Sequence, residues 1–251
     1  MNVPGPLILL RHGQSTTNAE GRFTGWADVP LTAHGEKQAA TAAQLLARDG
    51  LVPDAVHTSV LRRSIRTADI LLDELDRSWI PVHRTWRLNE RQYGALTGRV
   101  KREVRREVGP GQYRAWRRSL TAAPGPLPGG ELARLRADPR YAALHGDGLP
   151  AVESLADMIA RVAPYWADVL AGQLCSGRRV LVVAHGNALR ALIAVLDRLT
   201  GQEIEELNIP TGAPLRYDFD RGLRPVVRGG AYLDPDSART AAAAVAAEGQ
   251  A

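Results

Sequence analysis

Two short apolar runs in this chain end in the same way, each running into a histidine and a glycine. The stretches are LILLRHG (residues 7–13) and RVLVVAHG (residues 179–186). Their apolar residues are continuous rather than alternating, as expected of strands that helices cover on both faces. Because such runs alternate along the chain with helical patterns, we predict an α/β fold. It is a three-layer α/β/α sandwich with a mostly parallel central sheet.

Other segments fit the same alternation. Strands are predicted at residues 54–59 and 80–86, and helices at 59–76, 156–170 and 187–199. A further helix is predicted to start after Thr32, which can cap it, and to stop at Gly50.

Two regions depart from this rhythm within a chain that we expect to be a single domain, residues 1–251. Residues from about 95 to 152 combine Arg/Glu-rich helical patterns with a Pro/Gly-rich stretch, so we predict a helical insertion that covers one edge of the sheet. The tail, from about 234 to 251, is alanine-rich, with Asp234 as a candidate cap. Alanine forms helices without burying much surface, so this tail is expected to be mobile until something orders it.

Composition narrows the class of partner. The 251 residues carry a formal net charge of +5, which favours anionic partners without saying which. Aromatic residues make up 5% of the chain, too few for the stacking platforms of a single-strand nucleic-acid binder. Cys175 is the only cysteine, which fits a reducing compartment, and no run resembles a signal peptide or a membrane span. A cytoplasmic protein that binds neither nucleic acid nor membrane is expected.

The histidines at the strand ends carry the chemical signal. In open α/β sheets, ligands bind beyond the carboxyl ends of the strands, where Arg11, His12 and His185 are expected to lie. Asn187 opens the helix after the second run, and free amides at a helix start favour an anion. One such histidine is most often a structural residue, but two in the same setting indicate a site.

The segment RLNERQYGALTG adds a carboxylate, Glu90, that is suited to donate and accept a proton. In the predicted helix that follows residue 58, we choose Arg63 over its neighbour Arg62 as the residue that faces the site.

Two histidines and a glutamate would also fit a metal site, an alternative that the adjacent arginines disfavour. Guanidinium groups match phosphoryl oxygens, and a neutral imidazole can attack phosphorus. Phosphoryl transfer is the favoured chemistry.

Seven segments together resemble one family. They are LLRHGQSTTN, RFTGWADVPLT, TSVLRRSIRT, RLNERQYGALTG, WRRS, VAHGNALRAL and LNIPTGAPLRYDFD. In this order they are similar to the cofactor-dependent phosphoglycerate mutases of the histidine phosphatase superfamily, over nearly the whole chain. The resemblance implies the sandwich fold. It also implies interconversion of 3-phosphoglycerate and 2-phosphoglycerate through a phosphohistidine, primed by 2,3-bisphosphoglycerate and without a metal.

The resemblance also implies residue roles. His12 would carry the phosphoryl group, and Glu90 would move the proton. The residues implied to hold the transferring group are Arg11, Arg63, His185, Asn18, Gly186 and Asn187. Those implied to grip the substrate's carboxylate and its other phosphate are Thr24, Gly25, Arg91, Tyr93, Lys101, Arg117 and Arg118. The expected partner is a small phosphorylated acid, and the family's habit suggests a homodimer or a tetramer.

A phosphatase on the same scaffold remains the alternative, because its catalytic core would be the same. Retention of Lys101, Arg117 and Arg118 favours the mutase, since a simple phosphatase has less need to hold a second anionic group. The chain departs from the family pattern at four positions that flank the site, which leaves its substrate preference open. These positions are Thr17, Gln92, Val100 and Ala188.

Overall fold

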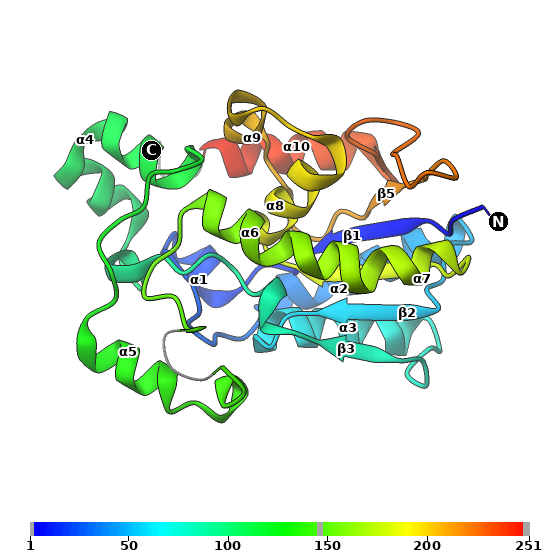
Figure 1. Cartoon of the computed structure of the whole chain (residues 1–251), viewed down its shortest axis with the longest axis horizontal. Helices are drawn as coiled ribbons and strands as arrows, with labels where there is room; N and C mark the ends of the chain where they lie inside the picture. The colour runs from blue at the N-terminus through cyan, green and yellow to red at the C-terminus, as the bar shows by residue number, and fades with distance from the viewer. Residues whose placement is uncertain (1–2, 145–147, 248–251) are drawn as a thin grey trace.

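The computed structural model describes residues 3–144 and 148–247, and a single twisted sheet organises them. The strand order is β3-β2-β4-β1-β5-β6 (Figure 1). The strands are β1 (Leu7–Arg11), β2 (Ala55–Thr58), β3 (Val82–Arg84), β4 (Val180–Ala184), β5 (Leu215–Tyr217) and β6 (Ala231–Tyr232). Strands β1 to β4 pair in parallel, whereas β5 lies antiparallel to both β1 and β6. The mostly parallel sheet is therefore confirmed, and the two short antiparallel strands are an addition to the prediction.

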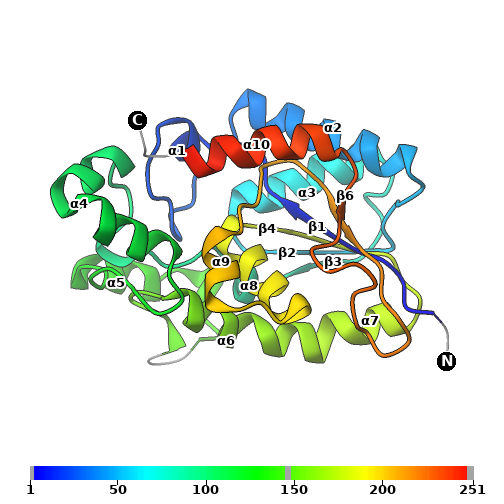
Figure 2. The same ribbon diagram turned by 90° about the horizontal axis from the view of Figure 1, so that it is seen from above.

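Helices cover both faces of the sheet, as Figure 2 shows. On one side lie α2 (Ala33–Arg48) and α3 (Arg62–Glu74), and on the other α6 (Leu155–Tyr165) and α8 (Gly186–Asp197). Alternate residues of each strand face opposite layers. Leu7 and Leu9 pack with the α6–α8 layer, and Ile8 and Leu10 pack with the α2–α3 layer. Burial on both faces explains why these strands read as continuous apolar runs. The remaining helices are α1 (Thr16–Ala19), α4 (Lys101–Arg118), α5 (Gly129–Arg136), α7 (Ala171–Cys175), α9 (Gly201–Glu206) and α10 (Pro235–Ala247).

The predicted helix boundaries hold with local exceptions. Thr32 caps α2 by accepting a hydrogen bond from the amide of Gly35, as predicted. Helix α3 begins at Arg62 rather than at Ser59, because the Ser59 hydroxyl accepts from the amide of Leu61 instead of extending the helix. The helix predicted at 156–170 ends its regular part at Tyr165 and continues as a π-helical turn.

Helices α4 and α5 occupy the region predicted as an insertion and lie beyond the ends of the parallel strands (Figure 1). Helix α4 is kinked at Gly109, whose φ is 79°. The tail forms α10, and Asp234 accepts from the amide of Ser237 as the predicted cap. Helix α10 runs toward α4 in both ribbon views (Figures 1 and 2). Residues 248–251 of the tail and 145–147 of the insertion lie outside the described residues, so the predicted mobility stays a prediction. Over the described ranges, no helix has the length and apolarity needed to cross a membrane.

Candidate active site

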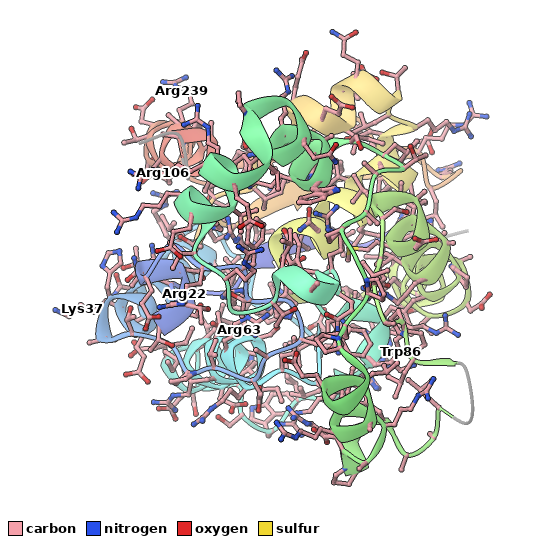
Figure 3. All side chains as sticks on the ribbon, turned by 90° about the vertical axis from the view of Figure 1, so that its left-hand side faces the viewer. Arg22, Lys37, Arg63, Trp86, Arg106 and Arg239 are labelled. Carbon is pink, nitrogen blue, oxygen red and sulfur yellow. The ribbon has the colours of Figure 1, made fainter. Side chains whose placement is uncertain are left out.

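The two His-Gly segments meet at one edge of the sheet. Strands β1 and β4 pair in register from Leu7 with Val180 to Arg11 with Ala184, so their ends are adjacent. The His12 amide continues the ladder by donating to the carbonyl of Ala184 over 3.0 Å. The rings of His12 and His185 then lie 4.9 Å apart with an interplanar angle of 63°. Figure 3 looks onto this edge, with Arg63 toward the middle of the view.

His12 is held as a neutral imidazole whose lone pair faces Arg63. Its Nδ1 lies 2.7 Å from the Gly13 carbonyl, which can only accept, so Nδ1 carries the proton. The lone pair is then on Nε2, which accepts a hydrogen bond of 3.3 Å from Arg63 Nε. Burial, and then the charges of Arg63 and Arg11, hold the pKa of His12 well below its usual value. Nε2 is therefore available as a nucleophile at neutral pH.

The loop after β1 is tied to the start of α2. A Cβ at Gly13 would lie 2.1 Å from the Gly35 carbonyl oxygen, and one at Gly35 would lie 2.1 Å from the oxygen of Gln14. The close neighbour of Gly13 is the backbone at the start of α2. Two glycines in contact thus fix the loop that orients His12.

Arg11 and Arg63 bring positive charge to His12. Arg11 donates from NH1 to the Ile209 carbonyl over 2.8 Å. Arg63 donates to the carbonyls of Ala27, at 2.8 Å, and Gly25, at 3.0 Å. Burial lowers the pKa of Arg63 to about 10, so the side chain remains charged at neutral pH. Both guanidinium groups are fixed by neutral carbonyls and not by a carboxylate, although Glu90 and Asp28 lie close enough to Arg63 to favour its charged form.

His185 lies behind the cavity rather than on its wall. Its Nε2 is 2.8 Å from the Ser59 hydroxyl, and its Nδ1 is buried with no hydrogen-bond partner among the described residues. Burial, and then the neighbouring Arg63, hold its pKa well below the usual value. An unpaired buried ring nitrogen next to His12 suits a hydrogen bond to a group bound there.

Glu90 enters the site from the irregular segment that follows β3. Its Oε1 accepts from the Asn187 side chain at 2.9 Å and from the amide of Arg91 at 2.6 Å. The same Asn187 nitrogen also lies 2.9 Å from the Tyr93 hydroxyl. A Cβ built at Gly186 would be 3.6 Å from the guanidinium carbon of Arg11 and 3.8 Å from Glu90 Oε2. The absence of a side chain there keeps the space between acid and cation open.

One cavity connects most of the residues predicted for the site. Those that line it are Arg11, His12, Asn18, Thr24, Arg63, Glu90, Tyr93, Lys101, Arg117, Arg118, Gly186 and Asn187. His185, Gly25 and Arg91 do not. Gly25 supports Arg63 through its carbonyl, whereas Arg91 is fully buried, donates to the Trp116 carbonyl and stacks on Tyr93 at 4.5 Å. Lys101, Arg117 and Arg118 come from α4, so the helical insertion forms part of the wall.

Arg190 is a cavity residue that the sequence reading did not single out. It lies one turn after Asn187 on α8 and donates to Asn187 Oδ1 over 2.9 Å, which turns that amide's nitrogen toward Glu90. It also donates to the Arg118 carbonyl at 3.3 Å. Burial lowers its pKa to about 9. Its spacing of three residues from Asn187 on a predicted helix was the signal that could have found it. The other unpredicted lining residues are Arg22, Phe23, Ile209 and Val245.

The charge of the cavity is one-sided. Among its described lining residues Glu90 is the only acid, against seven arginines and lysines. The Nε atoms of Arg11 and Arg190 are buried without a partner in the described part of the chain. Within the same residues no group of three histidine, cysteine, aspartate or glutamate side chains is placed to hold a metal ion. Such a donor set suits the oxygens of a phosphorylated, multiply charged ligand.

Sequence comparison agrees with this geometry. Residues 7–138 and 130–230 match the profile described as Histidine phosphatase superfamily (branch 1). The chain belongs to the histidine phosphatase superfamily. Within this superfamily it is 53% identical to a 2,3-bisphosphoglycerate-dependent phosphoglycerate mutase of Mycobacterium tuberculosis, over 98% of both chains. A protein of the same name from Clavibacter sepedonicus is 53% identical over 99% of both chains. The resemblance drawn from the seven segments is therefore confirmed.

Solved structures of the superfamily share the fold at lower identity. A mycobacterial glucosyl-3-phosphoglycerate phosphatase has a TM-score of 0.69 and 26% identity, over 90% of this chain and 100% of that one. An alpha-ribazole phosphatase from Shigella flexneri has a TM-score of 0.65 and 26% identity, over 90% of this chain and 97% of that one. These likenesses confirm the α/β architecture with its mostly parallel sheet.

Proposed function

We propose that this protein interconverts 3-phosphoglycerate and 2-phosphoglycerate through a phosphohistidine at His12, primed by 2,3-bisphosphoglycerate. The observation that carries the proposal is the cationic wall that α4 contributes to the cavity of His12. Lys101, Arg117 and Arg118 of α4 line the same cavity as the imidazole. A substrate with two anionic groups can therefore have one group at His12 while the other is held by α4. The relatives that are 53% identical over nearly their whole length carry the name of this mutase.

In the proposed reaction His12 Nε2 attacks phosphorus, so a P–N bond forms as the P–O bond to the donor breaks. Glu90 gives a proton to the departing oxygen and takes one from the attacking hydroxyl in the return step. Arg11, Arg63 and His185 hold the transferred group in line and stabilise its oxygens. The residues proposed to assist them are Asn18, Gly186 and Asn187.

The remaining predicted residues are proposed to bind the rest of the substrate. Lys101, Arg117 and Arg118 would contact the carboxylate and the second phosphate directly. Thr24 and Tyr93 line the same cavity, whereas Gly25 and Arg91 lie behind the wall and would act by supporting Arg63 and Tyr93. The unpaired nitrogens of Arg11 and Arg190 fit 2,3-bisphosphoglycerate as the priming donor, since each can donate to an anionic oxygen. No metal takes part in this proposal.

A phosphatase on the same scaffold is the alternative, with water replacing the hydroxyl as acceptor. The solved structures at 25–28% identity include phosphatases, which favours it at the level of fold. The greater identity to the mutases and the basic side chains of α4 favour the mutase. We further propose a cytoplasmic location and a homodimer, as expected of a glycolytic enzyme of this family, with a tetramer as the second possibility.

The test is isomerisation of 3-phosphoglycerate by the purified chain, with and without 2,3-bisphosphoglycerate, in the presence of a chelator. We expect activity that depends on the bisphosphate and is unchanged by chelation. Acid-free quenching and mass spectrometry should then place the phosphoryl group on His12. Release of inorganic phosphate without isomerisation would establish the phosphatase, and loss of activity on chelation would restore the metal interpretation.

A further inference from the structure

The backbone carbonyl of Glu90 accepts hydrogen bonds from side chains that do not line the cavity. It accepts from Trp26 Nε1 at 2.5 Å and from Arg161 NH2 at 3.3 Å. Arg161 is buried, with 6% of its surface exposed. Its NH1 donates hydrogen bonds to carbonyls of residues that precede Glu90. The carbonyls that accept from this nitrogen are those of Trp86 at 3.3 Å, Arg87 at 2.7 Å and Asn89 at 3.1 Å.

Glu153 forms an ion pair with Arg161 and also binds the segment around Glu90. Its Oε1 lies 2.7 Å from Arg161 Nε and its Oε2 2.9 Å from Arg161 NH2. The same Oε2 accepts from the amide of Gln92 at 2.9 Å. The pair therefore holds the segment on both sides of Glu90, because the cation binds carbonyls before and at residue 90 and the carboxylate binds an amide after it.

The segment that these side chains hold has no regular secondary structure. Residues 89–93 belong to no helix or strand. The Arg161 guanidinium lies 5.8 Å from the ring centroids of both Trp26 and Trp86, the latter labelled in Figure 3. A buried ion pair is weak evidence for stability, because apolar residues of the same volume often stabilise as well. What apolar residues cannot do is donate hydrogen bonds to the carbonyls of residues 86, 87, 89 and 90, as Arg161 does.

Neither Arg161 nor Glu153 lines the cavity, so neither contacts the substrate directly. The segment also carries Tyr93, which lines the cavity, and Arg91, which stacks on it, but the basic side chains of the cavity wall come from elsewhere, chiefly from β1, α3, α4 and α8. Movement of the 89–93 segment would therefore displace the Glu90 carboxylate while leaving those basic side chains in place. Proton transfer is sensitive to such displacement, since donor and acceptor must lie within hydrogen-bond reach.

We propose that the buried Arg161–Glu153 pair, together with the Trp26 indole, are positioning residues that set the Glu90 carboxylate for proton transfer. This inference rests on the proposed role of Glu90 in the phosphoryl transfer. It assigns to residues outside the cavity a large effect on the proton-dependent part of the reaction and a small one on anion binding.

The experiment compares two phosphoryl donors for His12. Transfer from an alkyl phosphate, 2,3-bisphosphoglycerate, requires a proton on the departing alkoxide. Transfer from p-nitrophenyl phosphate does not, because the nitrophenolate is a good leaving group. The main variant is the double substitution Glu153→Gln with Arg161→Gln, which leaves no unpaired buried charge. We expect the transfer rate from the alkyl donor to fall about 10- to 100-fold, with KM and the aryl rate changed less than about threefold.

Three further variants interpret that result. Glu90→Gln should show the same pattern with a larger loss, since it removes the proton itself. Trp26→Phe removes one donor to the Glu90 carbonyl and should give a smaller loss, about threefold, in the same direction. Asp54→Asn with Arg179→Gln is the control. This ion pair of 2.8 Å lies just before the first residues of β2 and β4, at the other end of these strands from His185. The double substitution should leave the ratio of alkyl to aryl rates unchanged.

Equal loss with both donors would show a merely structural role and overturn the inference. Unchanged rates with both donors would overturn it as well. Trp26→Phe, which keeps the ion pair, decides the matter if the double variant fails to fold. The proposed function is judged separately, because isomerisation of 3-phosphoglycerate by the unmodified protein is not part of this ratio. Isomerisation by the unmodified protein with an unchanged ratio in the variants would refute the positioning role alone.

Discussion

The edge of the sheet around His12 and the cationic wall supplied by α4 are built in different ways. At the edge, Arg63 and His12 are 1% and 3% exposed. Strand β1, which leads into His12, lies between two large apolar clusters, and α3, which carries Arg63, packs in one of them. The α4 wall packs through a small cluster of four buried side chains, and its Arg117 and Arg118 are half-buried. The reacting group is thus held rigidly, whereas the groups proposed to select the substrate stand on a lightly packed helix.

This difference suggests a division of labour. Phosphoryl transfer tolerates little misplacement, so its residues come from strand ends and a buried helix. Recognition of a second anionic group needs charge more than rigidity, and a separate helix can supply it without disturbing the sheet. The predictions below test whether chemistry and selection can be damaged independently.

The largest effect is expected at the sheet edge. His12→Ala removes the proposed nucleophile, and turnover should fall on the order of 10⁴-fold or more with both alkyl and aryl phosphates. Measurement of both activities, with mass spectrometry of the quenched protein, checks this. His34→Ala, an exposed histidine on α2, is the control and should behave as the unmodified chain. Phosphorylation of the His12→Ala variant at another residue during turnover would contradict the assignment.

A selective effect is expected at the α4 wall. Replacing Arg117 and Arg118 together by alanine should lower kcat/KM for 3-phosphoglycerate about 10²-fold, because two charge-assisted contacts are lost. Hydrolysis of p-nitrophenyl phosphate, which has no second anionic group, should change less than about threefold. Arg106→Ala, an exposed position on the same helix, should change neither activity. If both substrates lose activity in parallel, α4 supports the site structurally and the proposed division fails.

The same two regions differ in how far the sequence predicts them. The strand ends carry a strong signal, because continuous apolar runs predict parallel strands and parallel strands place their carboxyl ends together. That reasoning was enough to bring His12, His185 and Arg11 to one edge. Helical geometry allowed only one of Arg62 and Arg63 to face the site and did not itself decide for Arg63. It did not predict β5 and β6, which have only three and two residues and too short an alternation to read.

The substrate-binding role of the α4 residues was predicted only from the resemblance to a family. Lys101 and Arg117 are separated by most of a kinked helix, and nothing in an Arg/Glu-rich pattern distinguishes a cavity wall from a solvated face. Arg161 and Glu153 were missed for a related reason. Their partners are backbone carbonyls and an amide, which leave no pattern in the sequence. Arg91 shows the converse, since its motif is specific but its side chain lies behind the cavity.

A smaller effect is expected from the tail. Helix α10 places Val245 on the cavity wall, so deletion of residues 234–251 should admit water to the phosphohistidine. The ratio of phosphate release to isomerisation is then expected to rise about 3- to 10-fold while His12 is still phosphorylated. Both products can be measured in one assay. Since Leu233 packs against the α2–α3 layer, the deletion keeps it, and thermal unfolding checks that the sheet is intact. An unchanged ratio would show that α10 does not exclude water.

The smallest expected effect is on how folding stability depends on pH. The sheet region contains buried histidines that titrate in the acidic range, whereas α4 contains none. His12, His185 and His57 are buried in the sheet layer with lowered pKa values, about 4 for His57, chiefly because burial disfavours the charged form. No histidine lies on α4. Between these lowered values and about pH 6.5, where an unfolded histidine titrates, the unfolded chain holds more protons than the native one. Stability should therefore be complete above about pH 6.5 and fall as the pH drops below it, by up to about 1.4 kcal/mol per pH unit for each such histidine.

Urea unfolding at several pH values between neutral and mildly acidic checks this slope. His57 accepts from the Tyr165 hydroxyl at 2.6 Å and lies 3.1 Å from the Gln173 amide oxygen, so its imidazole is held neutral away from the cavity. Substitution by glutamine at His57 should remove its share of the slope, and substitution at His12 should remove another of similar size. The α4 variants should keep the full slope, since arginine does not titrate in this range. Because the shares come from separate buried sites, they should add. A pH-independent stability, or a slope that the Arg117 and Arg118 substitutions reduce, would show that acid acts on the α4 wall and not on the sheet.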